Sequence, residues 1–407
     1  MFKERNFLIL WLGQLVSIFG GRFSDLVIPW VVLQVTDSPL KAAIVAISTQ
    51  IAPLLFSLPA GVWIENRSKK KIAMLSEMIR TIMMTLLVVV ILFGEFNLLV
   101  ICSILFVTSL AGLFFRISLN ALLPGITGRK RLVDAHNYLE AADAVSTLIG
   151  PILAGFLLSA IGAAATLGID AFTFLLSFAS IGLLKLGEKS FSKSKERKID
   201  KKQSLQDGLE GVKLLFSTKI QRFISFNHSV LNFSTHAVTL LVVITAKQEL
   251  GLSAFQTGIL LSGAGIGNLI AIFVMARLKE AHWNKLYGSI MLCSGMGVFL
   301  IAISSTMWGA FVGMILFDGA LSMAFVVNGA ARQTVTTNQF LARISSGGIL
   351  LSGIVVILAN GFAGLISEGF NPILGLLFCA GLLLINSGIS FAQLHLKRSI
   401  SSLGFEE

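Results

Sequence analysis

The sequence predicts an all-α membrane protein with twelve transmembrane helices in two six-helix bundles. Composition is the first reason: of 407 residues, 55% are hydrophobic and only 13% are charged. Soluble globular proteins are about 45–50% apolar and about 25% charged, so this chain has too few charges to cover a water-exposed surface. The mean hydropathy of +0.85 and the 7 prolines also exclude collagen-like and disordered classes. A large water-soluble enzyme is therefore excluded.

Long apolar runs separated by short polar segments are the second reason. A helix needs roughly 20 mostly apolar residues to cross a bilayer. Twelve runs qualify, at residues 7–35, 40–63, 72–93, 97–118, 137–161, 165–186, 220–246, 254–278, 285–305, 308–329, 344–367 and 372–396. The first run is too long for the apolar core of a signal peptide, so we expect it to be the first span. Most connections are too short to hold a soluble catalytic domain.

The positions of Lys and Arg predict the orientation. Of the 32 residues of these two types, all but Arg22, Lys41, Arg80 and Lys247 lie near the span ends that share a side with the N-terminus. Cytoplasmic loops of membrane proteins carry such an excess. We therefore expect a multi-pass protein of the cell membrane with both termini in the cytoplasm. Loop placement also explains the net charge of +11 without nucleic acid as a partner.

A charged central segment divides the chain into two halves. Residues 189–202 have the composition of a solvated linker, and residues 204–216 have the spacing of a short amphipathic helix. We expect an N-terminal six-helix bundle at 1–187, a cytoplasmic linker with that helix at 188–217, and a C-terminal bundle with a cytoplasmic tail at 218–407. The matching order of spans and loops in the two halves favours a duplicated unit, a pattern common in secondary transporters.

The loop between the second and third spans has an unusual composition. It reads Gly61-Val-Trp-Ile-Glu65-Asn66-Arg67-Ser68-Lys69-Lys70-Lys71. Glycine at a helix end allows a close helix crossing, and an acid at a helix end can face the positive N-terminus of a neighbouring helix. The alternative is an ordinary cytoplasmic loop. The embedded acid favours an inner gate, to which we also assign Glu77, Arg80 and Arg116.

Polar and charged residues inside the spans are the candidates for substrate binding and coupling. An ionised carboxylate at mid-bilayer costs roughly 2.5–3.5 kcal/mol, so it usually faces a cavity or a partner. The substrate-cavity candidates are Gln14, Arg22, Asp25, His228, Asn232 and Asp318. The proton-coupling candidates are Asp318, Asp25, Asp143 and His236. A structural Arg22–Asp25 ion pair and histidines satisfied by packing are the alternatives.

The sequence offers no pattern for covalent or metal chemistry. It has no nucleophile triad, metal-ligand cluster or phosphate-binding loop, so we expect neither an enzyme nor a cofactor nor a metal. The three cysteines, Cys102, Cys293 and Cys379, lie in apolar runs and give no disulfide framework. The 31 phenylalanines and a few carboxylates suit a lipophilic substrate, including one with a positive charge. Lipid-facing positions, however, explain most of these rings.

The loop motif resembles the signature of the major facilitator superfamily: a glycine, three residues, an acid and a basic run. Other stretches are similar to its drug–proton antiporter branch, which includes macrolide-efflux proteins. They are Leu10-Trp-Leu-Gly-Gln14, Ile28-Pro-Trp30, Thr36-Asp-Ser-Pro39, Leu122-Leu-Pro124, Gly150-Pro151-Ile-Leu-Ala-Gly155 and Asp170-Ala-Phe-Thr-Phe174. Glu65 and Asn66 stand where the family usually has Asp and Arg. The arginine-and-glutamine motif that some antiporters carry in the fourth span is absent.

The resemblance implies the major facilitator fold, with spans one, four, seven and ten around a central cavity. It implies secondary transport by alternating access, specifically proton-coupled efflux of an amphiphilic drug or metabolite by a monomer without an ATPase subunit. It also implies a helix kink at Gly150, Pro151 and Gly155, because proline removes a helical hydrogen bond; a packing kink without a directional role is the alternative. Ion-coupled uptake, lysolipid transport and a non-transporting receptor or scaffold are the competing functions.

Overall fold

The computed structural model describes residues 4–65, 67–94, 96–128, 131–185, 210–278, 282–337 and 340–393. These residues form eleven long helices. They are α1 (Arg5–Thr36), α2 (Pro39–Glu65), α3 (Lys69–Leu92), α4 (Leu98–Thr127), α5 (Leu132–Leu183), α7 (Lys219–Gln248), α8 (Ala254–Arg277), α9 (Trp283–Ile303), α10 (Met307–Thr334), α11 (Leu341–Gly369) and α12 (Pro372–Ala392). Most of the expected linker and the C-terminal tail lie outside the described residues.

Helix α5 crosses the molecule twice. It is 52 residues long, and Gly162 interrupts it with φ 81° and ψ 172°, a backbone conformation that glycine adopts without strain. Both ends of α5 lie beside the start of α1, because Trp11 Nε1 donates to Tyr138 O at 2.9 Å and Asn6 Nδ2 donates to Lys185 O at 2.8 Å. The chain therefore reverses at Gly162, and the described helices make the twelve crossings that the sequence predicted.

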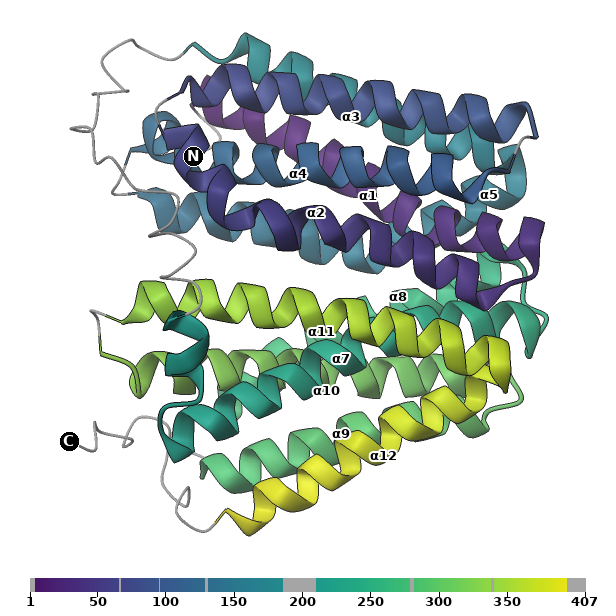
Figure 1. The fold of residues 1–407 in the computed structure, drawn as a ribbon, viewed down its shortest axis with the longest axis vertical. Coiled ribbons are helices and arrows are strands. Elements are labelled where there is room, and N and C mark those ends of the chain that lie inside the picture. Colours follow the sequence, from purple (N-terminus) through teal and green to yellow (C-terminus); the bar gives the residue numbers. More distant parts are fainter. Residues whose placement is uncertain are drawn as a thin grey trace.

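The helices form two bundles that lie side by side (Figure 1). In the first bundle, α1 packs against α5, and α3 packs against α4 and α5. In the second bundle, α12 packs against α9, and α10 packs against α8 and α9. The bundles meet where α5 contacts α8 and where α2 contacts α11. This arrangement confirms the predicted all-α fold of two six-helix bundles.

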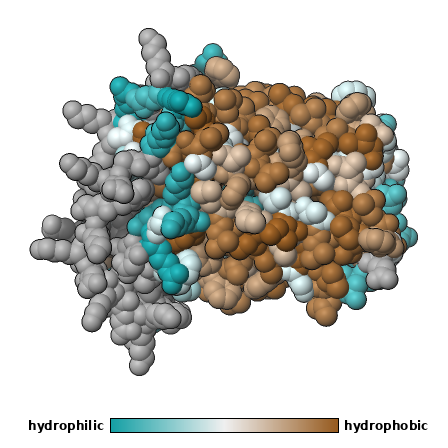
Figure 2. All heavy atoms as spheres, turned by 90° about the horizontal axis from the view of Figure 1, so that it is seen from above, coloured by the Kyte–Doolittle hydropathy of each residue, from teal (hydrophilic) through white to brown (hydrophobic). Residues whose placement is uncertain are grey.

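Apolar side chains cover the outside of the molecule. Figure 2 shows a broad hydrophobic band across the middle, with hydrophilic residues toward both ends. Ile272, Phe273 and Leu365 each leave more than half of their surface exposed, which suits contact with lipid tails rather than water. Eleven helices in the described part of the chain are long and apolar enough to cross a membrane. The protein is therefore a multi-pass membrane protein.

The two ends of the bundles differ in charge. We call the end that holds the starts of α1, α3, α5, α7, α9 and α11 the basic end, and the opposite end the far end.

Side-chain caps fix where several helices begin: Asn97 Oδ1 accepts from Leu99 N at the start of α4, and Ser253 forms a capping box with Gln256 at the start of α8. Helix α4 continues at the basic end to Thr127, beyond the predicted end of the span.

The described part of the linker contains a short helix at residues 210–215. It rests on the start of α11, because a Cβ on Gly211 would lie 2.8 Å from the carbonyl carbon of Arg343. Glu210 also pairs with Arg343 at 3.0 Å. The rest of the predicted amphipathic segment lies outside the described residues. The linker is thus anchored to the second bundle at its basic end.

Candidate functional site

Close backbone contact joins the two bundles in their far-end half. A Cβ on Gly155 would lie 2.9 Å from the Cα of Phe255 on α8. A Cβ on Gly258 of α8 would lie 2.9 Å from the carbonyl carbon of Pro151. Real Cβ atoms do not come this close to backbone, so α5 and α8 can touch here only because both positions are glycine. The predicted kink segment thus forms part of the contact between bundles.

Glu368 connects the bundles at the far end. Its Oε2 accepts from Ser38 Oγ at 2.8 Å and from Leu40 N at 3.1 Å. Ser38 and Leu40 lie at the start of α2, where the first backbone amides have no partner within the helix and carry a partial positive charge. A carboxylate from the end of α11 therefore caps a helix of the other bundle.

Arg22 of α1 is the centre of a charged cluster partway along the helices. Its Nη2 donates to Asp143 Oδ1 and to Thr147 Oγ1, each at 2.9 Å, on α5. Asp25 Oδ2 lies 3.7 Å from Nη1, so the predicted Arg22–Asp25 pair forms but is longer than the pair with Asp143. The Arg22 side chain crosses α5 at Gly150, where a Cβ would lie 2.7 Å from Arg22 Cβ.

Asp318 of α10 faces this cluster from the second bundle. Asn268 Nδ2 of α8 donates to Asp318 Oδ2 at 3.4 Å. The side chains of Asp25 and Asp143 keep 72% and 51% of their surface exposed, so they border open space. Two of the four predicted coupling residues, Asp25 and Asp143, therefore pair with one guanidinium. The fourth, His236, is half-buried on α7.

A separate polar network lies inside the first bundle. Glu77 is fully buried and pairs with Arg80 at 2.9 Å, and the Arg80 guanidinium lies 3.7 Å from the centre of the Phe174 ring. Gln14 is also buried and donates to Ser177 Oγ at 3.0 Å. These residues were predicted at the inner gate and in the substrate cavity. In the structure they lie inside the first bundle instead, because the faces of α1 and α3 that carry them turn toward α5.

A cavity of about 860 Å³ lies between the bundles in their basic-end half. Its volume is in the range of small-molecule sites, roughly 300–1,000 Å³. Helices α2 and α4 line one side, and α7, α10 and α11 line the other. The lining residues are Gln50, Pro53, Leu54, Ser57, Leu113, Arg116, Ile117, Asn120, His228, Gly329, Arg332, Gln333, Ile344, Ser345, Gly348, Ile349, Ser352, Gly353 and Val356.

The chemistry of this lining differs from that expected from composition. Its charged residues are Arg116 and Arg332, and no Asp, Glu or Phe is among the described residues that line it. Of the predicted cavity residues, His228 is the one found in this lining, and its Nε2 lies 3.1 Å from Ser352 Oγ. Asn232 instead donates to the His228 carbonyl within α7 at 2.9 Å. Arg116, which we assigned to the inner gate, lines this cavity from α4.

The loop between α2 and α3 folds back on the first bundle. Lys70 Nζ donates to the carbonyls of Gly182 and Leu184, each at 2.8 Å, and so caps the end of α5. The guanidinium carbon of Arg67 lies 3.9 Å from the centre of the Trp63 ring. Both basic side chains are thus held within their own bundle.

The other predicted gate residues of this loop have fewer described contacts. A Cβ on Gly61 would meet no atom of the described residues within 4 Å, so that part of the chain makes no close helix crossing at Gly61 in this conformation. Lys69 is the first residue of α3. The side chain of Glu65 lies outside the described part of the structure.

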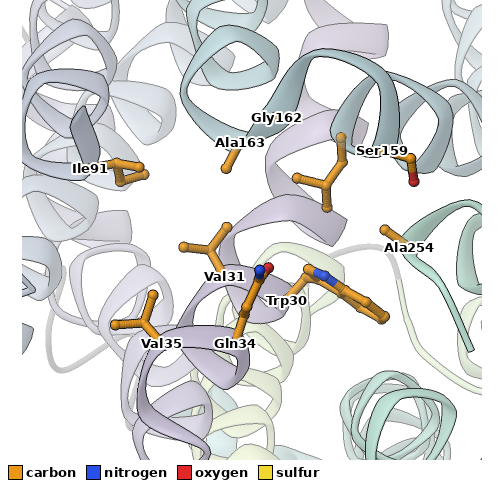
Figure 3. Close-up of a pocket in the computed structure, with 10 residues that line it drawn as sticks. Trp30, Val31, Gln34, Val35, Ile91, Ser159, Gly162, Ala163 and Ala254 are labelled. Carbon is orange, nitrogen blue, oxygen red and sulfur yellow. The ribbon is translucent and has the colours of Figure 1, made fainter. Parts of the chain in front are cut away.

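A second cavity of about 430 Å³ lies at the far end, between α1, α3, α5 and α8 (Figure 3). Trp30, Val31 and Val35 of α1 line it beside the turn at Gly162, and the amide of Gln34 points into it. No ionisable residue is among its described lining. It therefore offers neither a charge for a substrate nor a group for a proton.

Comparison with known proteins identifies the family. The model of the transmembrane secretion effector family, a branch of the major facilitator superfamily, matches residues 1–402. The chain belongs to this family. Membership confirms the predicted superfamily, which is a family of transporters and not of enzymes.

The individual proteins that this chain resembles are distant in sequence. The multidrug efflux pump Tap of Mycolicibacterium fortuitum is 24% identical over 227 residues, which cover 54% of each chain. Macrolide efflux protein A of Streptococcus pyogenes is 22% identical over 181 residues, 44% of this chain and 45% of that protein. The chain thus matches about half the length of each efflux protein. The uncharacterized MFS-type transporter YkuC of Bacillus subtilis is 21% identical over 85% of this chain and 81% of its own.

Solved structures share the fold. A bacterial homologue of the iron transporter ferroportin, in an inward-facing state, superposes with a TM-score of 0.73 at 15% identity, covering 94% of this chain and 98% of that one. A bacterial homologue of the lysosomal transporter Spinster gives a TM-score of 0.74 at 12% identity, covering 96% and 97%. These likenesses confirm the major facilitator fold.

Sequence reasoning missed most of the cavity. Arg332 was counted as one more basic residue at a span end, and Gln50 and Asn120 were not singled out. The sequence does contain a feature that marks them, because each is a polar residue in or beside an apolar run. Periodicity alone, however, does not say which face of a helix turns toward the other bundle.

Proposed function

We propose that the protein exports an amphiphilic small molecule by alternating access, driven by protons moving inward. The main support is the placement of the large cavity. It lies between the bundles in their basic-end half, while glycine contacts and Glu368 join the bundles toward the far end. A secondary transporter needs such a site between two bundles that rock against each other. The named efflux relatives favour export over ion-coupled uptake.

The charged cluster is the proposed coupling site. Arg22 is shared by Asp143 and Asp25 of the first bundle, and we infer that its charge also acts on Asp318 of the second. Protonation of one carboxylate changes which acid the arginine holds, and so changes the attraction between the bundles. We assign the carrier role to Asp318, because its neighbour Asn268 is neutral and Asp318 makes no ion pair with the residues that the structure describes.

We infer that the protein acts as a monomer in the cell membrane with its basic end in the cytoplasm. The resemblance to the superfamily implies a monomer, and the Lys and Arg pattern follows the positive-inside rule. Single cysteines at Lys213 and at Lys41, in a background where Cys102, Cys293 and Cys379 are replaced, test the orientation. An impermeant thiol reagent added to intact cells is expected to label position 41 only. Labelling at position 213 would reverse the orientation.

The transport proposal is tested in a bacterium that lacks its major efflux pumps. Expression is expected to raise resistance to part of a panel of lipophilic compounds, and a protonophore is expected to remove that gain. Cells with an empty vector are the control. Resistance that survives the protonophore would contradict proton coupling. Accumulation of the compounds in expressing cells would instead support uptake, and faster inward flipping of a labelled lysolipid would support lysolipid transport.

A further inference from the structure

The large cavity carries positive charge that the coupling site does not use. Arg116 lines it from the first bundle and Arg332 from the second. The ion pairs in the described part of the chain are made by other arginines, and no carboxylate is among the described lining residues. The two cations therefore face a shared space without a described counter-ion.

Arg332 has hydrogen-bonding capacity to spare. Its Nε and Nη2 are buried and have no hydrogen-bond partner among the described residues. Its remaining nitrogen, Nη1, lies beside α11 at Gly348, where a Cβ would be 3.2 Å away. Burying donors without partners costs free energy, and the cost is larger for a charged group. A ligand that accepts from these nitrogens, once the Arg332 side chain turns toward the cavity, would remove that cost.

The rest of the lining has the two characters of an amphiphile site. Polar groups lie near the arginines, among them His228 and Gln333. Apolar side chains from both bundles supply the remainder, namely Leu54, Leu113, Ile117, Ile344, Ile349 and Val356. Guanidinium groups bind carboxylates and phosphates through paired hydrogen bonds. A cation in the same space would meet two like charges in a medium that screens poorly.

We propose that this cavity binds an amphiphile through an acidic group, a carboxylate or a phosphate, held by Arg332 and Arg116. The inference rests on the proposed function, because it takes the cavity as the substrate site, and it deepens that function by naming the substrate class. It also replaces the cationic substrate that the composition favoured.

Three fluorescent probes with one apolar body test the charge preference. Dansylglycine is an anion, dansylglycinamide is neutral and dansylcadaverine is a cation. Titrated into the purified full-length protein in lipid nanodiscs, dansylglycine is expected to bind at least about tenfold more tightly than the other two, since a hydrogen bond to a charged group contributes about 1.5–3 kcal/mol. Tighter binding of the cation, or equal binding of all three, would overturn the proposal.

Substitutions locate the site. Arg332→Gln and, separately, Arg116→Gln are expected to weaken dansylglycine binding about tenfold and to leave dansylglycinamide binding unchanged. Arg332→Lys keeps the charge and is expected to restore part of the affinity. Lys41→Gln removes one positive charge at the far end and is the matched control. Wild-type affinity for dansylglycine in both glutamine variants would overturn the assignment, and the wild-type probe series stands even if one variant fails to fold.

Competition identifies the source of the acidic group. Lysophosphatidic acid or dodecanoate is expected to displace dansylglycine at micromolar concentration, whereas inorganic phosphate is not. Displacement by phosphate alone would mean a small soluble anion and would overturn the amphiphile part. These measurements use no ion gradient. Anion binding without drug resistance would therefore contradict only the export proposal, and resistance without anion binding would contradict only this one.

Discussion

At the scale of residues, three groups of charged side chains within and between the bundles have different partners. Glu77 and Arg80 neutralise each other inside one bundle, so they have little reason to change during transport. Arg116 and Arg332 face the cavity without a described acid. Among these described groups, only the Arg22 cluster contains several carboxylates. These carboxylates border open space, and they come from both bundles. A proton that enters this cluster can therefore alter the contact between bundles.

Asp318→Asn tests the carrier role at this scale. The amide keeps the size of the side chain but cannot bind and release a proton, so uphill accumulation of substrate in inverted vesicles under a pH gradient is expected to be lost. Downhill exchange is expected to stay within about twofold of wild type, because conformational change itself does not need that charge. Glu140→Gln, on an exposed residue of α5, is the control. Uphill pumping by Asp318→Asn would pass the role to Asp143 or His236.

At the scale of elements, α5 combines contact and charge on one helix. Its glycines meet α8, Asp143 holds Arg22 of α1, and Gly150 gives room for the Arg22 side chain. The sequence predicted the kink segment and singled out Asp143, because both stand out in an apolar run. The partners were not predictable, since they depend on how far each helix is rotated about its axis within the assembled bundle.

Gly155→Ala tests the contact between α5 and α8. The added Cβ would lie 2.9 Å from Phe255 Cα, and overpacking of this kind costs about 1–3 kcal/mol. We expect the far end to open more often, so a cysteine at Ser159 is expected to react faster with an impermeant thiol reagent applied from outside. Gly168→Ala, on the same helix with no atom within 4 Å of the added Cβ, is the control. Equal rates in the two variants would contradict a sealing role for the contact.

Gly61→Leu tests the loop between α2 and α3. No atom lies within 4 Å of a Cβ at this position, so substrate binding from the basic end is expected to be unchanged. Turnover is expected to fall several-fold at equal expression, because the basic end must close for the cycle to continue and the larger side chain then lies between the bundles. Binding and turnover are measured on the same preparation. Normal turnover would make this an ordinary loop.

At the scale of the whole molecule, what could be predicted depended on the range of the interactions. The twelve crossings followed from the lengths of apolar runs, which the bilayer thickness constrains directly. The reversal at Gly162 lies within α5, between the predicted spans at residues 137–161 and 165–186. The cavity lining was not predictable in the same way, because Arg332 and Gln50 are far apart in sequence and meet only through the packing of two bundles. Such packing also differs between the states of a transporter, so one sequence encodes more than one lining.

Glu368→Gln tests the balance between those states. Gln keeps a hydrogen-bond acceptor for Ser38 but removes the negative charge at the start of α2, a contribution of about 1 kcal/mol. The far end is then expected to open and the basic end to close, shifting a two-state equilibrium roughly fivefold. Nitroxide labels at Lys71 and Lys219, on opposite bundles at the basic end, would report this in pulsed electron resonance as a larger population of short distances. Glu249→Gln is a matched control, because Glu249 accepts from Asn371 at 3.0 Å at the same end but within one bundle. An unchanged distance distribution in Glu368→Gln would mean that the glycine contacts alone hold the far end closed.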